Sequence, residues 1–197
     1  MIKRTFDIVA SLILILAFLP IFVLISLLII VFMPGSVFFI HERVGKNGKS
    51  FKLIKFRTMQ PPKKKEQGSF DAGDKSRITK LGVFLRKTKL DELPQLINVL
   101  KGEMSIVGPR PEVRKWTEEY PEQWRIALSV RPGITDNASI KFRNEEEILA
   151  KSDNPQETYR NEILPEKLKL YIDYVNNQSL AGDLKIILRT IKAVIIK

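Results

Sequence analysis

Residues 89–112 read KLDELPQLINVLKGEMSIVGPRPE, and this stretch organises the rest of the sequence. It places two adjacent carboxylates, Asp91 and Glu92, just ahead of Pro94, and a proline is tolerated in the first turn of a helix. Apolar residues then recur at helical spacing as far as a lysine–glycine pair, which is typical of a helix end. We therefore expect both carboxylates near the positive end of a helix dipole, a position that favours their ionised form and also suits phosphate.

Basic residues from other parts of the sequence could gather around this carboxylate pair. Arg110 stands between two prolines that restrict its backbone. Guanidinium groups bind phosphate oxygens in a bidentate manner, so several cations around two carboxylates indicate a phosphate-handling centre. The alternative is that Asp91 and Glu92 only cap a helix. The candidate cations are Lys55, Arg57, Arg86 and Arg110.

The carboxylate pair also suggests nucleophilic chemistry at phosphorus. A carboxylate can attack phosphorus to form an acyl phosphate, provided that a divalent ion and nearby cations screen the phosphate oxygens. One carboxylate could thus be the nucleophile while its neighbour holds Mg²⁺. The chain has no cysteine and a single histidine, His41, which excludes a catalytic thiol and a multi-histidine metal site. Any bound metal must therefore rely mainly on oxygen ligands, and such ligands favour magnesium.

The run of residues 8–40 carries no charged side chain and is almost purely apolar up to residue 33, which indicates a membrane segment. Pro20 lies near the middle of this run, where it removes a backbone donor and favours a kink. Basic residues flank the run on both sides, and such residues favour the cytoplasmic side of a membrane. We therefore favour a re-entrant, proline-broken helix hairpin over residues 1–35. A kinked single span that only anchors the chain stays open.

The remainder, residues 36–197, mixes strands and helices. Apolar runs rich in β-forming residues flank the turn GKNG at 45–48, which predicts a β-hairpin. Polar residues with prolines and glycines predict a mobile loop over 60–76. The segment 180–197 has one apolar and one basic face, so it predicts an amphipathic helix that packs on the domain or lies on the membrane surface. We expect a small, helix-dominated α/β cytosolic domain with amphipathic interfacial helices, attached to the membrane hairpin.

The formal net charge of +11 suits anionic lipid, phosphate-bearing substrates or nucleic acid. The cations alternate with carboxylates and rigid prolines rather than forming a basic stripe with stacking aromatic residues, so nucleic acid is not an expected partner. Two alternatives to an enzyme stay open. One is a membrane-tethered binding module that grips anionic lipid or nucleic acid, and the other is a scaffold that recruits other enzymes to the membrane.

Several motifs, in order along nearly the whole chain, resemble those of the bacterial sugar transferase family, the small monotopic phosphoglycosyl transferases. A chance match of the whole ordered set is not credible. The motifs are Lys3-Arg4-Thr5-Phe6-Asp7, Arg43-Val44-Gly45, KFRTM, the stretch of residues 89–112, VRPGIT, YIDYV and DLKII.

The resemblance implies transfer of a sugar 1-phosphate from a UDP-sugar to polyprenyl phosphate, which the family indicates to be undecaprenyl phosphate, with release of UMP. This is the first membrane step in the assembly of exopolysaccharide, capsule, O-antigen or glycoprotein glycans. It implies a phospholipid membrane as a partner and a place in the bacterial inner membrane, with the catalytic domain on the cytoplasmic face. A homodimer is compatible with the sequence, which does not name the sugar or the polymer.

The resemblance also implies roles for individual residues. Asp91 would attack the sugar-linked phosphate to form a covalent aspartyl-phosphosugar intermediate, and polyprenyl phosphate would then displace it. Glu92 would support the charge balance of the site and, with Asp91, the binding of Mg²⁺. Basic residues at family positions would hold the phosphates: Lys55, Arg86 and Arg110, with Arg57 and Arg131 as further candidates.

Two departures from the family pattern stand out. Leu19 precedes the membrane proline, where many members have a serine whose hydroxyl can stabilise the break. After VRPGIT many members continue Gly-Trp-Ala-Gln-Val-Asn-Gly-Arg, but residues 136–143 read DNASIKFR and are followed by Asn144 and three glutamates. The second departure bears on sugar and nucleotide recognition and leaves the chemistry expected of Asp91 unchanged.

Overall fold

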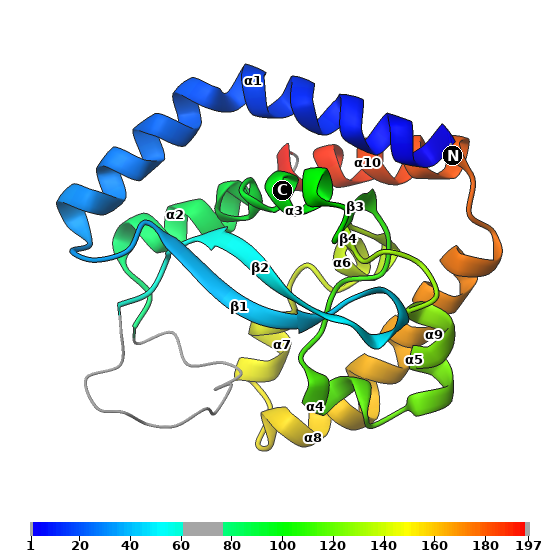
Figure 1. Ribbon diagram of the computed structural model, residues 1–197. Helices are drawn as coiled ribbons and strands as arrows, with labels where there is room; N and C mark the ends of the chain where they lie inside the picture. The colour runs from blue at the N-terminus through cyan, green and yellow to red at the C-terminus, as the bar shows by residue number, and fades with distance from the viewer. Residues whose placement is uncertain (1, 61–76, 196–197) are drawn as a thin grey trace.

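The computed structural model describes residues 2–60 and 77–195, and helices dominate its α/β fold (Figure 1). The loop expected over 60–76 lies outside the described residues from position 61 onward. The elements, in chain order, are α1 (Ile2–Phe32), β1 (Phe38–Val44), η1 (Lys46–Gly48), β2 (Ser50–Phe56), α2 (Lys80–Thr88), η2 (Leu90–Glu92), α3 (Gln95–Lys101), β3 (Ser105–Val107), α4 (Arg114–Thr117), α5 (Pro121–Ala127), β4 (Gly133–Thr135), α6 (Asn137–Lys141), α7 (Glu145–Ala150), α8 (Pro155–Thr158), η3 (Tyr159–Ile163), α9 (Leu164–Asn176) and α10 (Leu180–Ile195).

Helix α1 contains Pro20 and continues through it as one helix, which arches over one side of the molecule in Figure 1. The expected break into two helices is replaced by this curvature, because a proline removes one backbone hydrogen bond and bends a helix without having to end it. Among the described residues, α1 is the one helix long and apolar enough to cross a membrane, with a mean hydropathy of 3.3 in its most apolar window.

Strands β1 and β2 form the antiparallel hairpin that the sequence predicts, with Phe38 opposite Phe56 and Val44 opposite Ser50. Asn47 and Gly48 in its turn have φ values of 56° and 75°, a left-handed conformation that asparagine and glycine tolerate best. The hairpin therefore confirms the turn expected at residues 45–48, and it carries Lys55 near the end of β2.

Strands β3 and β4 form a short parallel ladder that the sequence did not reveal, pairing Ser105 with Gly133 and Val107 with Thr135. The backbone after β3 stays paired with β4, because Gly108 N–H donates to the Thr135 carbonyl and Gly133 N–H donates to the Pro109 carbonyl. A Cβ atom on Gly133 would lie 2.1 Å from the Gly108 nitrogen, so only glycine fits there. This close pairing fixes the backbone that leads into Arg110.

Helix α3 differs in detail from the expected helix. It begins at Gln95, and Asp91 and Glu92 lie ahead of it in the separate 3₁₀ turn η2. Its fully buried residues include the polar Gln95 and Asn98 as well as two apolar ones, Leu96 and Val99. The leucine-rich spacing did not indicate this face, because η2 breaks the helical period between the carboxylates and the helix.

Helix α10 lies on the same side of the molecule as α1 (Figure 1). Asp183 and Ile186 point inward and are 0% and 6% exposed. The apolar Leu184, Leu188 and Ile191 remain exposed. One face of α10 therefore packs on the domain, while its apolar face is left uncovered by the described residues, so both of the expected contacts remain compatible with the helix.

Candidate functional site

Asp91 and Glu92 are presented by a sharp change of direction between α2 and α3. Lys89 ends α2 in a left-handed conformation with φ of 59°, which is uncommon for a residue that has a Cβ. Strained backbone of this kind concentrates at functional sites. The chain then turns through η2, which directs both carboxylates inward, so that each residue is only 7% exposed.

Glu92 is held by two cations from two other elements. Lys55 Nζ, from β2, lies 2.8 Å from Glu92 Oε1. Arg110, from the segment after β3, donates from Nη2 to Oε1 at 2.5 Å and from Nη1 to Oε2 at 3.3 Å. The hairpin, η2 and the end of the parallel ladder therefore meet at one carboxylate, and the arginine contact is bidentate.

The electrostatics of this cluster keep Glu92 ionised. Burial alone would raise the pKa of Glu92, but Arg110 and then Lys55 outweigh it and hold this pKa well below its usual range. Glu92 in turn raises the pKa of Arg110 against the opposing effect of burial. Burial lowers the pKa of Lys55, even though Glu92 counteracts it. Two cations thus converge on one carboxylate, and their charges are fixed in place beside Asp91.

Asp91 is the opposite case within the same turn. Its Oδ1 is buried and has no hydrogen-bond partner in the described parts of the chain, 2–60 and 77–195. Burial, and then the neighbouring charge of Glu92, raise the pKa of Asp91, while Lys55, Lys89 and Arg86 act in the other direction without reversing the shift. A buried carboxylate oxygen without a donor is costly for the fold, and such groups concentrate where chemistry occurs.

The carboxylate oxygens of Asp91 and Glu92 differ in how well they suit a magnesium ion. Among the described residues no group of three acidic, histidine or cysteine side chains could enclose a metal ion. Magnesium usually takes one or two carboxylates and completes its shell with water and substrate phosphates. Asp91 Oδ1 fits such a ligand, because no side chain or backbone group in the described part of the chain bonds to it. The oxygens of Glu92 face Lys55 and Arg110, which suits the orientation of those cations better than metal ligation.

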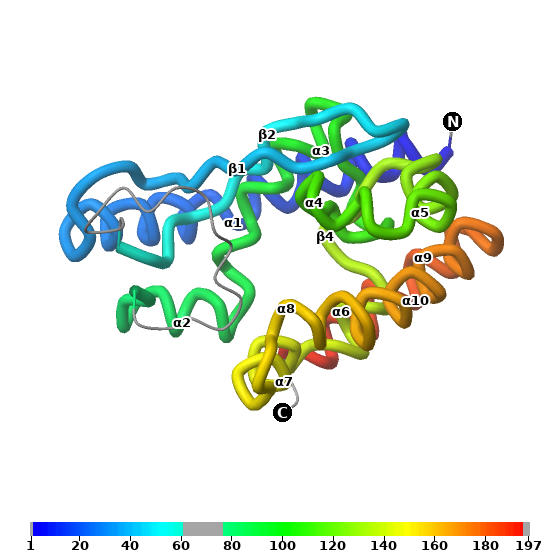
Figure 2. The backbone as a smooth tube through the Cα atoms, turned by 90° about the horizontal axis from the view of Figure 1, so that it is seen from below, coloured from blue at the N-terminus to red at the C-terminus, as the bar shows by residue number. Residues whose placement is uncertain are grey.

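Arg86 lies beside the carboxylate turn without touching Glu92. Its Nε donates to Thr58 Oγ1 at 3.1 Å, and its Nη1 pairs with Glu146 Oε1 of α7 at 3.0 Å. Figure 2 shows α2, which carries Arg86, standing apart from the group formed by α6 to α10. The Arg86–Glu146 pair therefore joins two parts of the molecule that are distant in sequence.

Arg57 and Arg131, the further phosphate candidates, lie at the ends of helices. Arg57 donates to the carbonyl oxygens of Met33 and Pro34, just beyond α1. Arg131 Nε donates at 2.8 Å to the carbonyl of Gly102, the residue that caps α3. Cations stabilise helix C-termini, where carbonyl groups lack helical partners. Contact of Arg57 and Arg131 with phosphate stays a prediction, since neither is bonded to the carboxylate pair.

A family comparison adds to this geometry. The family model described as "Bacterial sugar transferase" matches residues 1–197. The chain belongs to the bacterial sugar transferase family. Its sequence relatives include the "Exopolysaccharide production protein ExoY" of Rhizobium meliloti (strain 1021), which is 38% identical over 98% of this chain and 85% of its own length.

Two longer relatives of this sugar transferase carry names that state a reaction. The UDP-glucose:undecaprenyl-phosphate glucose-1-phosphate transferase of Escherichia coli (strain K12) is 35% identical over 97% of this chain and 39% of its own length. The UDP-N-acetylgalactosamine-undecaprenyl-phosphate N-acetylgalactosaminephosphotransferase of Aeromonas hydrophila is 33% identical over 98% of this chain and 44% of its own length. The two names differ in the sugar and agree in the lipid carrier.

Asn98 supports the strand that carries Lys55, and the sequence did not reveal this role. Its Oδ1 accepts from Ile54 N–H at 3.1 Å, and its Nδ2 donates to the Lys52 carbonyl at 2.7 Å. Asn98 thereby ties α3 to β2 and sets the position of Lys55 relative to η2. The one signal was an asparagine inside a helical run, which is unfavourable unless its side chain finds a specific partner.

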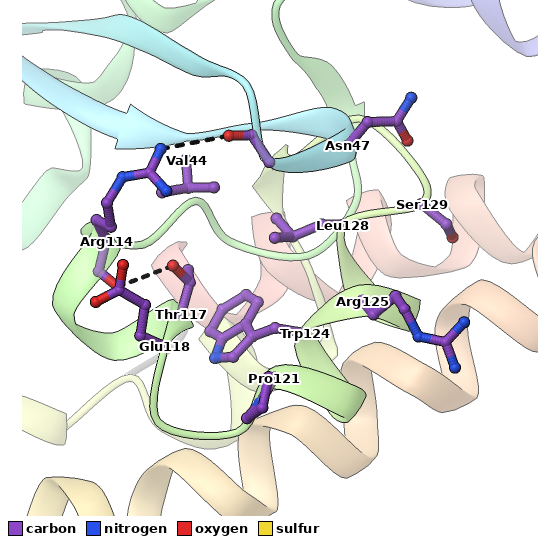
Figure 3. A pocket seen from close by; sticks show the side chains of 11 residues that line it. Val44, Asn47, Arg114, Thr117, Glu118, Pro121, Trp124, Arg125, Leu128 and Ser129 are labelled. Carbon is purple, nitrogen blue, oxygen red and sulfur yellow. Dashed lines mark hydrogen bonds between the residues drawn. The ribbon is translucent and has the colours of Figure 1, made fainter.

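A cavity of about 470 Å³ lies away from the carboxylate pair. Figure 3 shows it between the hairpin turn and helices α4 and α5, with Val44, Trp124 and Leu128 among its apolar walls and Arg114 and Arg125 among its charged ones. Neither Asp91 nor Glu92 lines this cavity, so the candidate site is defined by the converging charges and not by this cavity.

Proposed function

We propose that this sugar transferase moves a sugar 1-phosphate from a UDP-sugar to undecaprenyl phosphate through a covalent intermediate on Asp91, with release of UMP. The carrying observation is the contrast within η2, where Oδ1 of Asp91 is buried with no partner among the described residues while Glu92 is bound by Lys55 and Arg110. The names of the relatives support the donor and acceptor classes. The product would begin the assembly of exopolysaccharide or a related glycan.

In the first step a carboxylate oxygen of Asp91 attacks the phosphorus that bears the sugar. The Asp91–phosphorus bond forms as the bond from this phosphorus to the bridging oxygen breaks, and UMP leaves with the electron pair of that bond. Lys55 and Arg110 are oriented by Glu92, so their charges are fixed before negative charge develops on the phosphate oxygens.

In the second step a phosphate oxygen of the polyprenyl acceptor attacks the same phosphorus. The new phosphorus–oxygen bond forms as the bond to Asp91 breaks, which restores the carboxylate and yields polyprenyl diphosphosugar. When Mg²⁺ is bound, with Asp91 and the donor phosphates as ligands, it would neutralise phosphate charge. Burial raises the pKa of the Asp91 carboxyl, so its carboxylate is poorly stabilised by its surroundings, which would favour bond formation to phosphorus.

The docking of α1 supports a re-entrant membrane helix, because both of its ends contact the same domain. Arg4, near the start, donates to the carbonyls of Val99 and Leu100 in α3. Ile25 and Ile29, near the end, are buried in an apolar cluster with Phe56 and Leu85, while the apolar side chains on the outer face remain exposed.

A straight span of 31 residues would be roughly 45 Å long and would place the two ends of α1 on opposite sides of a bilayer. The proposed arrangement therefore has α1 entering and leaving one leaflet, with the domain of residues 36–197 on the cytoplasmic side of the bacterial inner membrane. The exposed apolar face of α10 would then rest on the same surface.

The test is a burst experiment with full-length protein in nanodiscs. With Mg²⁺ and a panel of UDP-sugars but no acceptor, we expect one equivalent of UMP per active site and a phosphosugar adduct on the peptide that contains Asp91. Adding undecaprenyl phosphate should convert the burst into steady turnover. The surface variant Arg125→Gln is the control and should behave as wild type.

Two results would refute the proposal. One is UMP release that requires the acceptor from the first turnover, because direct transfer needs no enzyme intermediate. The other is full activity in a folded Asp91→Asn protein. Salt-sensitive lipid binding without turnover of any donor would instead favour the binding module.

A further inference from the structure

A buried polar cluster joins the starts of α1 and α10 away from the carboxylate site. Lys3 Nζ of α1 lies 2.6 Å from Asp183 Oδ2 of α10 and donates to the carbonyl of Val107, in β3, at 3.1 Å. Asp183 is 0% exposed, and the side chain of Lys3 is 25% exposed. The transfer mechanism does not use this ion pair, although a buried pair is costly to maintain.

Tyr174 of α9 completes the cluster. Its hydroxyl lies 2.9 Å from Asp183 Oδ1 and 3.0 Å from the Val107 carbonyl, and it accepts from Gln178 Nε2 at 3.0 Å. One phenol proton can serve only one acceptor, and a carboxylate is the stronger acceptor. Ser105 Oγ also lies 3.0 Å from the Val107 carbonyl, but its single proton has the Asp7 carboxylate, at 2.8 Å, as the stronger acceptor. Lys3 is therefore the principal donor to the Val107 carbonyl, while Tyr174 fixes the carboxylate that holds Lys3.

A second carboxylate of α1 holds the rest of the same strand. Asp7, which is 2% exposed, accepts from Ser105 Oγ at 2.8 Å and from Ile106 N–H at 3.1 Å. It also lies 3.9 Å from Lys3. The start of α1 thus binds three consecutive residues of β3, through Asp7 at Ser105 and Ile106 and through Lys3 at Val107.

Strand β3 leads directly into the segment that carries Arg110. Gly108 and Pro109 are both bonded to the β4 side of the ladder, and two prolines restrict the backbone around Arg110. Because this backbone is restrained on both sides of Arg110, we expect a shift of Val107 to move the guanidinium that binds Glu92.

We propose that Lys3 and Asp183 form a latch that positions Arg110 when α1 and α10 dock together on the domain. Both are positioning residues, since neither touches the carboxylate pair. The latch makes transfer depend on the arrangement of the two helices with exposed apolar faces, which couples membrane docking to the charge cluster. This inference rests on the proposed function.

The test is a kinetic double-mutant cycle in nanodiscs with the UDP-sugar that wild type turns over. The double variant Lys3→Gln/Asp183→Asn removes both charges of the pair together, and Asp7, which loses the cation 3.9 Å away, keeps its hydrogen bonds from Ser105 and Ile106. We expect its kcat to fall about 10- to 100-fold. In an Arg110→Lys background the same pair of changes should cost less than about twofold, because the latch acts through Arg110.

A latch that only supports the fold gives a different result. The fold-decreases in kcat caused by loss of the latch and by Arg110→Lys would then multiply in the combined variant, and such independent effects would overturn the proposal. Lys3→Arg keeps the charge and should recover most of the activity, whereas failure of this rescue in a folded protein would also contradict the latch. Arg125→Gln again serves as the surface control.

Hydrogen exchange separates this inference from the proposed function. If wild type releases no UMP from any donor, the proposed function fails, and exchange alone then decides the latch. Amide exchange in residues 105–112 should rise at least fivefold in Lys3→Gln/Asp183→Asn, while exchange in the hairpin at 38–56 stays unchanged. Equal exchange of residues 105–112 in the variant and wild type would overturn the latch.

Discussion

Two turns of this protein each bury an aspartate, and they treat it in opposite ways. In η2, Oδ1 of Asp91 has no hydrogen-bond partner within the described residues. At the start of α6, Asp136 is 2% exposed and accepts from Ala138 N–H at 2.6 Å, from Ser139 N–H at 2.9 Å and from Ser139 Oγ at 2.5 Å. Burial raises the pKa of both carboxyl groups.

The difference separates stabilising groups from reactive ones. Asp136 satisfies the free N–H groups at the start of a helix, so its burial contributes to folding. Asp91 is desolvated without a comparable set of hydrogen bonds among the described residues. Its burial therefore lowers the free energy of unfolding and leaves an oxygen available to an electrophile or a cation. Substitutions at the two aspartates should therefore have opposite effects on activity and stability.

The largest effect is expected for Asp91→Asn. Steady-state UMP release should fall at least about a thousandfold, as it does when a nucleophile is removed from an enzyme. The melting temperature should stay equal to that of wild type or rise, because an amide is less costly to bury than an unpaired carboxylate. Parallel kinetics and thermal unfolding in nanodiscs measure both quantities. A destabilised Asp91→Asn protein would show that Asp91 has a structural role like that of Asp136.

The sequence could place the carboxylate pair just ahead of a helix because the signals for a helix start are local. An Asp-Glu pair ahead of Pro94 marks the start of a helix, and the flanking motifs carry the family resemblance. The left-handed Lys89, which separates η2 from α2, has no comparable sequence signal. Local patterns thus locate the carboxylates without showing how they are turned inward.

The convergence on Glu92 depends on contacts between distant segments. Lys55 and Arg110 meet there because of the hairpin register and the parallel ladder of β3 with β4, and three-residue strands are too short to be recognised by alternation. Arg57 and Arg131 are the weaker phosphate candidates from the sequence, and in the structure both donate to carbonyl groups at helix ends, which are also good acceptors for a guanidinium. Residue type therefore predicted the cations, and only the fold distinguishes their partners.

A second, smaller effect is expected for Glu92→Gln. Turnover should fall about a hundredfold, because Lys55 and Arg110 lose the charge that orients them. Unlike Asp91→Asn, this change should also reduce stability, by roughly 2 kcal/mol, since charged hydrogen bonds are lost. Urea unfolding followed by tryptophan fluorescence gives that value. Unchanged stability would mean that the two cations find other partners, and the contrast within η2 would then fail.

A third effect tests the other aspartate. Asp136→Ala should lower the free energy of unfolding by about 1 kcal/mol, the usual cost of losing a helix N-cap, while turnover stays within about threefold of wild type. Asp91→Ala is the matched variant and should show the reverse pattern. Loss of turnover in Asp136→Ala without loss of stability would assign Asp136 to the site, beside Arg110.

The smallest effect concerns the ion pair between Arg86 and Glu146, which links α2 to α7. Arg86 Nη1 is occupied by Glu146, whose side chain is 61% exposed, so a donor phosphate that uses this nitrogen must displace the carboxylate. An exposed pair is worth up to about 1 kcal/mol. Glu146→Gln should therefore lower KM for the UDP-sugar about two- to threefold with kcat unchanged.

Glu147→Gln is the matched control for Glu146→Gln, because Glu147 is an exposed neighbour on α7 and its neutralisation changes the net charge equally. If the two variants lower KM alike, the effect comes from general attraction of the anionic donor and not from release of Arg86. If Glu146→Gln raises KM, Glu146 orients Arg86 instead of competing for it. The segment that departs most from the family pattern would then contribute a positioning group to the phosphate site, and the division between reactive and stabilising carboxylates would extend into α7.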